Sequence, residues 1–108
     1  VASWQETASR CAVTGAIAVW GAGAKGATFC NLVDPDVQLI SCVVDINPTK
    51  QGRFIAGTGH PIVSPYELTT RCPGFVFVLN PNYTHEIARD LASRSIQATV
   101  YDLMASVK

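Results

Sequence analysis

Short apolar runs alternate along this chain with longer stretches in which apolar residues recur every three or four positions. Runs of this length, flanked by turn-forming residues, are typical of strands that are buried on both faces of a parallel sheet. Five strands are predicted, at residues 16–20, 39–44, 61–63, 75–79 and 98–101.

The intervening stretches predict helices. Residues 24–33 form one, with Ala27, Cys30 and either Leu32 or Val33 facing inward, and Asp34-Pro35 stops it. A second helix opens at Ser64, whose side chain can cap the first turn. Pro65 suits the first helical position and Glu67 completes a capping box.

A third helix is predicted to start with Thr84 as its cap, with Glu86 well placed in the first turn. Its buried residues are expected to be Ile87, Ala88 and Leu91. Residues 1–14 stand outside this alternation, and Trp4 to Cys11 is interpreted as a helix that connects to a preceding domain. Residues 15–108 then form one α/β domain.

Regular alternation of strand and helix specifies a parallel sheet with right-handed crossovers. The predicted fold is a Rossmann-like three-layer sandwich with strand order 3-2-1-4-5. In such a sheet, ligands bind in the crevice at the carboxyl ends of the first and fourth strands.

Composition narrows the classes of function. The chain has 108 residues, 48% of them hydrophobic, and its eight basic residues balance eight acidic ones. A neutral chain lacks the basic face that nonspecific nucleic-acid binding needs. No apolar run approaches the roughly 20 residues that cross a bilayer, and the start has no signal-peptide pattern. We therefore expect a cytoplasmic protein without nucleic-acid or membrane partners, and the missing initiator Met is typical of a piece of a longer chain.

Cys11, Cys30, Cys42 and Cys72 show no CxxC spacing. They are predicted to be small buried residues in a reducing compartment rather than zinc ligands or disulfide partners. His60 and His85 have no partner at metal-ligand spacing either. No nucleophile with a neighbouring base and no paired carboxylates in the crevice are apparent, so neither a catalytic nor a metal site is predicted.

The strongest local signal is the string GAGAKG, which follows the first strand directly. Gly21 permits a tight turn, Gly23 lets the backbone approach a ligand, and Gly26 lets helix and strand pack closely. Amide groups at the helix start then face an anion, and Lys25 adds a cation. The alternative is a tight turn that binds nothing.

Asp45 closes the second strand, where a dinucleotide-binding domain carries its ribose-binding carboxylate. It can equally cap the turn that it opens. Downstream, Asn47, Lys50 and Arg53 either bring polar and positive groups to the crevice or form a solvated face.

Asn80, Asn82 and Tyr83 follow the fourth strand at the same edge of the sheet. Their side chains can supply hydrogen bonds and a stacking surface to a ligand. Ordinary turn formation by Asn and Pro explains the same residues.

Three strings together resemble the C-terminal domain of SAM-dependent C-methyltransferases, including those that act on sugar nucleotides. They are IAVWGAGAKG at 17–26, VDINPTKQGRF at 44–54 and GTGHPI at 57–62. The resemblance implies an enzyme with a zinc-binding domain, a central domain that binds S-adenosylmethionine (SAM) and transfers the methyl group, and this domain. It places the glycine turn and residues 47–53 on the side of a phosphorylated substrate, with no cofactor bound by this part of the chain.

Two departures from that family concern Gly23, which replaces a small residue of another type, and residues 80–83, where a Trp-Asn pair is usual. The departure at residues 80–83 leaves open which sugar or other methyl acceptor the enzyme would bind. A SAM site within this chain is not expected, because residues 18–20 (AVW) lack the acidic residue that usually precedes its glycine turn. The alternatives are an NAD(P)- or nucleotide-binding domain of an oxidoreductase or sugar-modifying enzyme, and a scaffold without a ligand.

Overall fold

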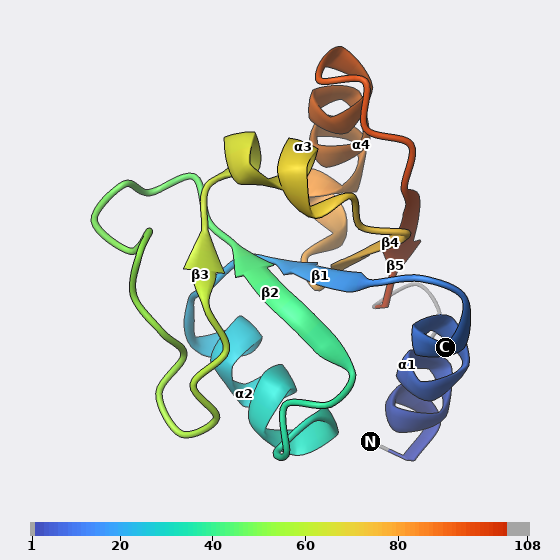
Figure 1. Cartoon of the computed structure of the whole chain (residues 1–108), viewed down its shortest axis with the longest axis vertical. Coiled ribbons are helices and arrows are strands. Elements are labelled where there is room, and N and C mark those ends of the chain that lie inside the picture. The colour runs from blue at the N-terminus through green and yellow to red at the C-terminus, as the bar shows by residue number, and fades with distance from the viewer. Residues whose placement is uncertain (1, 104–108) are drawn as a thin grey trace.

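A computed structural model describes residues 2–103 and shows one sheet of five parallel strands (Figure 1). The strands are β1 (Ile17–Trp20), β2 (Ile40–Val44), β3 (Ile62–Val63), β4 (Phe75–Val78) and β5 (Thr99–Asp102). Their order is β3-β2-β1-β4-β5, with every neighbouring pair parallel, which confirms the predicted fold and strand order.

The helices are α1 (Ala2–Thr14), α2 (Ala24–Val33), α3 (Leu68–Arg71) and α4 (Thr84–Ser93), with short 3-10 turns at Pro65–Glu67 and Pro81–Tyr83. Figure 1 shows α1 and α2 on one face of the sheet and α3 and α4 on the other. Side chains of β1 alternate between these layers, since Ile17 and Val19 belong to the first core cluster and Ala18 to the second.

Helix α1 is longer than the predicted Trp4–Cys11 segment and packs on the sheet and on α2. Ala8 is completely buried, the rings of Trp4 and Phe29 lie 5.5 Å apart, and Gln5 Nε2 donates to the Val33 carbonyl at 3.3 Å. The helix therefore helps to close this layer of the core. A connection to a preceding domain stays a prediction.

The predicted start of the second helix is confirmed in part. Ser64 Oγ accepts a hydrogen bond from the backbone N–H of Glu67 at 3.2 Å. The carboxylate of Glu67 does not complete a capping box; it accepts from Arg71 Nε at 2.9 Å, one helical turn further along.

The prediction that Thr84 caps α4 is wrong. Asn80 Oδ1 accepts from the N–H of Asn82 and starts a 3-10 turn, so Thr84 is already the first residue of α4. Its hydroxyl instead donates to Asp102 Oδ2 on β5 at 3.0 Å. Ala88 is exposed rather than buried, because only Ile87 and Leu91 of the predicted set face the sheet.

On α2, Asp34 ends the helix as predicted, and Val33 rather than Leu32 faces inward. Cys11, Cys30 and Cys42 are buried as predicted, whereas Cys72 is exposed. Burial, helped by the negative charge of Asp34, raises the pKa of the Cys30 thiol to about 12. Among the described residues, no helix has the length and apolar character needed to cross a bilayer.

The segment between β2 and β3 folds back along the free edge of β3. The N–H of Ile62 donates to the Arg53 carbonyl at 2.8 Å, and the N–H of Gly52 donates to the Ile62 carbonyl at 2.9 Å. Phe54 and Pro61 form an antiparallel bridge within the same segment.

Candidate functional site

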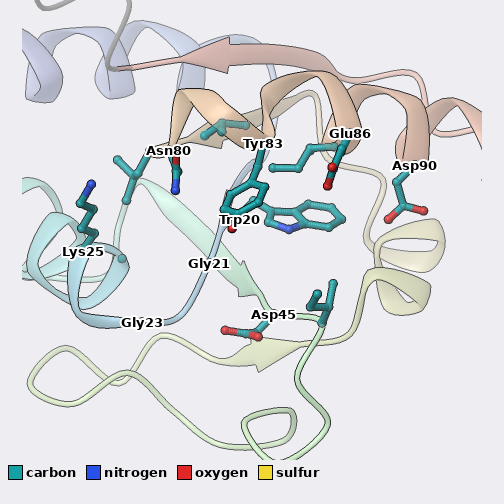
Figure 2. A pocket seen from close by; sticks show the side chains of 14 residues that line it. Trp20, Gly21, Gly23, Lys25, Asp45, Asn80, Tyr83, Glu86 and Asp90 are labelled. Atoms are coloured by element: carbon teal, nitrogen blue, oxygen red, sulfur yellow. The ribbon is translucent and has the colours of Figure 1, made fainter.

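A cavity of about 580 Å³ lies at the carboxyl ends of β1 and β4, between the start of α2 and the inner face of α4 (Figure 2). This is the crevice that the strand order predicts as the ligand-binding position. The residues that line it are Trp20, Gly21, Gly23, Lys25, Gly26, Asp45, Ile46, Val78, Leu79, Asn80, Tyr83, Glu86, Ile87 and Asp90.

The glycines of the first turn differ in what they do. Gly21 has a φ of +113°, which favours glycine, and a Cβ on Gly26 would overlap the carbonyl oxygen of Gly21. The turn itself therefore requires these two. A Cβ on Gly23 would meet nothing within 4 Å, so the fold does not require glycine there. Its missing side chain leaves the cavity open beside the start of α2.

The opening turn of α2 presents backbone N–H groups to the cavity. Gly23 is the residue before the helix and provides no side-chain cap, so these amides have no side chain as an acceptor. Lys25, in the same turn, lines this cavity and also a second one beside Trp4 and Phe29. Amides and an ammonium group on one wall make this end of the cavity suited to an anion.

Asp45 joins the glycine turn to the loop that follows β2. Its Oδ2 accepts from the N–H of Ala22 at 3.0 Å, and its Oδ1 accepts from the N–H of Asn47 at 2.8 Å. The N–H of Gly21 also donates to the Val44 carbonyl at 2.6 Å, so two amides of the glycine turn are already paired within the chain. Turn capping by Asp45, one of its two predicted roles, is present in the structure, and the residue also lines the cavity.

Four of the predicted site residues do not line the cavity: Asn47, Lys50, Arg53 and Asn82. Asn47 Oδ1 accepts from the N–H and the hydroxyl of Thr49, so its side chain serves its own turn. The other seven predicted residues do come together around the cavity: Gly21, Gly23, Lys25, Gly26, Asp45, Asn80 and Tyr83.

The loop between β2 and β3 is held in place by hydrogen bonds within the loop and to α2. Gln51 Nε2 donates to the Asp45 carbonyl at 2.8 Å, and Asn31 Nδ2 on α2 donates to the Ala56 carbonyl at 3.0 Å. His60 is completely buried, with its Nε2 2.8 Å from Asp34 Oδ2. This ring fastens the loop to the end of α2.

Asp34 is 2% exposed and is surrounded by donors. Its carboxylate accepts from His60 and, at 2.8 Å each, from the N–H groups of Gln38 and Ile40. Burial alone would raise the pKa of this carboxyl, but the hydrogen bonds outweigh it and hold the pKa below its ordinary value. This buried polar pair is a structural anchor outside the cavity.

Sequence reasoning missed three polar or aromatic residues of the cavity: Trp20, Glu86 and Asp90. The expectation that the crevice holds no paired carboxylates is corrected here, since Glu86 and Asp90 are one turn apart on the same face of α4. That spacing was the available signal. Asp90 Oδ1 also accepts from Arg94 Nε at 3.0 Å.

Charge is unevenly distributed over the cavity. Lys25 lies beside the glycine turn, whereas Glu86 and Asp90 lie on the opposite side of the view in Figure 2. The site can therefore bind a ligand that is anionic at one end and rich in hydrogen-bond donors at the other. Within residues 2–103, no three His, Cys, Asp or Glu side chains are grouped as a metal site would require.

Similarity to known proteins bears on the family of the chain rather than on the geometry of its cavity. No curated protein matches the chain. A family model described as the C-methyltransferase C-terminal domain matches residues 6–100, which include every strand except the end of β5. This match confirms the resemblance carried by the three sequence strings. The chain therefore belongs to the family of C-methyltransferase C-terminal domains.

Proposed function

We propose that this domain binds the substrate of a SAM-dependent C-methyltransferase and that this substrate is a nucleotide-linked sugar or a similar phosphorylated acceptor. The methyl transfer and SAM itself belong to a central domain of the same enzyme, next to a zinc-binding domain. Membership of the family supports the methyltransferase part of the proposal. The substrate part rests on the cavity.

One observation carries the proposal: the uncapped start of α2 and Lys25 share a wall of a cavity at the carboxyl edge of the sheet. Backbone amides at a helix start bind phosphate oxygens, and an ammonium group adds a charge-assisted bond. The volume of about 580 Å³ is within the range of small-molecule sites. Together these features suit a phosphorylated small molecule.

A second candidate is an NAD(P)- or nucleotide-binding domain, which the position of Asp45 at the end of β2 favours. Each oxygen of Asp45 accepts one backbone hydrogen bond, and each retains a lone pair that a ribose hydroxyl can use. The two candidates differ in the ligand they predict, so binding measurements separate them.

Titration calorimetry of the chain with UDP-glucose, dTDP-glucose, NADH and SAM tests the proposal. We expect a sugar nucleotide to bind and NADH and SAM not to bind. Tight NADH binding without sugar-nucleotide binding supports the second candidate instead and contradicts the first.

Lys25→Ala should weaken sugar-nucleotide binding about tenfold, because it removes a charge-assisted hydrogen bond of about 1–2 kcal/mol. Lys50→Ala is the matched control, since Lys50 does not line the cavity and its loss should leave the affinity unchanged. Equal affinities of the wild type and Lys25→Ala would show that the ammonium group does not reach the phosphate.

A further inference from the structure

Trp20 differs from the core aromatic residues in how its ring is used. Trp4, Phe29, Phe77 and Tyr101 pack ring against ring in a continuous series, with centroids 5.5 to 6.2 Å apart. Trp20 ends β1 after three completely buried residues, is only partly buried and lines the cavity. Trp20 packs against the second core cluster and, among the described side chains, takes part in no such ring pair, so the part of its indole that borders the cavity is available to a ligand.

Tyr83 supplies a second aromatic ring to the same cavity from the 3-10 turn before α4. It is 53% exposed and makes the cavity wall together with Trp20. In Figure 2 both rings lie to the right of Lys25, and Glu86 lies above the indole of Trp20. An aromatic surface therefore adjoins the anion-binding end of the cavity.

We propose that Trp20 is a specificity-determining residue of this site, on which the nucleobase of a phosphorylated ligand stacks while its phosphate meets the glycine turn. The inference rests on the proposed function and deepens it, because it assigns the base and the phosphate to different walls. Stacking against an aromatic side chain suits any base, since every base has a π-face. The specificity that Trp20 confers is therefore for a nucleotide over a sugar phosphate without a base. Glu86, which lies above the indole in Figure 2, offers carboxylate oxygens to the N–H groups at the edge of the base.

The experiment compares two ligands that share a 5-phosphate and differ in the base: uridine 5′-monophosphate (UMP) and ribose 5-phosphate. Calorimetry on the wild-type chain should give an affinity for UMP that is at least about tenfold higher than the affinity for ribose 5-phosphate. Trp20→Leu should reduce that ratio to about one, because it weakens the binding of UMP far more than that of ribose 5-phosphate. Retained ribose 5-phosphate binding also shows that the variant is folded.

Two further variants complete the design. Lys25→Ala should weaken both ligands by the same factor, because the phosphate is common to them. Tyr66→Leu is the matched aromatic control: Tyr66 is 78% exposed and does not line the cavity, so the ratio should not change. In a Trp4→Phe background, UMP but not ribose 5-phosphate should quench the fluorescence of Trp20.

The outcomes separate a failure of the stacking inference from a failure of the proposed function. A wild-type ratio of one, with phosphate binding retained, overturns the stacking inference alone. Tighter binding of glucose 1-phosphate than of UMP overturns it as well and assigns the aromatic wall to a sugar. Binding of neither UMP nor any sugar phosphate overturns the proposed function and this inference with it.

Discussion

The glycine turn at 21–26 and the loop at 45–61 carry the two most recognisable strings of the sequence, yet they are used differently. The turn borders the cavity with the uncapped start of α2, Lys25 and an unfilled space at Gly23. In the loop, the side chains of Asn47 and Gln51 form hydrogen bonds within the loop, and the His60 ring bonds to Asp34 at the end of α2. Only Asp45 and Ile46, at its start, line the cavity.

This difference shows that the specificity of a motif and contact with a ligand are separate properties. The DINPTKQGR string is the more characteristic of the two, and the structure explains much of it by hydrogen bonds that fix the loop. The shorter GAGAKG string contains one glycine that the fold does not require. A residue that the fold does not explain is the better indicator of a ligand.

The largest expected effect separates the glycines within the turn. Gly26→Ala should destabilise the chain by about 3 kcal/mol or more, because the new Cβ overlaps the Gly21 carbonyl and backbone has to move. Gly23→Ala should cost less than about 1 kcal/mol, since its Cβ enters open space. The remaining cost is that alanine is less favourable than glycine at the position before a helix. Urea unfolding measures both, and a similar cost for the two would remove the distinction.

A somewhat smaller effect is expected where the loop is anchored. Asp34→Asn should cost about 2–4 kcal/mol at pH 7, because buried donors from His60, Gln38 and Ile40 lose their carboxylate. Ligand binding at the cavity should persist in conditions where the variant is folded.

The same carboxyl predicts a pH dependence. Its pKa is lower in the folded chain than its ordinary value of 3.8, so its contribution to stability is complete above that pH and disappears as the pH falls through the folded pKa. The difference in unfolding free energy between wild type and Asp34→Asn should therefore shrink below pH 3.8. A difference that stays constant down to pH 2.5 would contradict the role of the ionised form.

The smallest expected effect tests whether the loop contacts the ligand. Gln51→Ala removes the hydrogen bond from Nε2 to the Asp45 carbonyl and should cost about 1 kcal/mol of stability. Its affinity for UMP should equal that of the wild type, in contrast to Lys25→Ala. A tenfold loss of affinity would show that the loop's polar residues act on the ligand and that the two regions are not functionally distinct.

Much of the fold follows from local pattern together with general rules of topology. Apolar runs identify buried strands, and right-handed crossovers then leave few possible strand orders. The start of α4 is not predicted correctly because Asn80 and Pro81 form a 3-10 turn ahead of Thr84. Asn80 caps that turn, and the turn leads directly into the helix at Thr84, which therefore needs no cap of its own. Ala88 is exposed because it points about 100° away from Ile87 around the helix, and the sheet covers only the stripe through Ile87 and Leu91.

The site was less predictable from sequence than the fold. The residues of the glycine turn can be placed from the sequence, because they directly follow the end of a strand. Lys50 and Arg53 cannot be placed in this way, because the direction of a side chain in a long loop depends on how the loop folds back. The spacing of Glu86 and Asp90 indicates that they share one face of a helix, but only the position of α4 shows that this face borders the crevice.

The folding back of residues 52–54 along β3 has a further consequence, for self-association. A strand at the border of a sheet offers unpaired N–H and C=O groups to other chains, and β3 has only two residues, Ile62 and Val63. The Ile62 N–H and carbonyl are already bonded to Arg53 and Gly52, and Pro61 beside them has no N–H to offer. This side of the sheet is thereby shielded against the edge-to-edge pairing that begins aggregation.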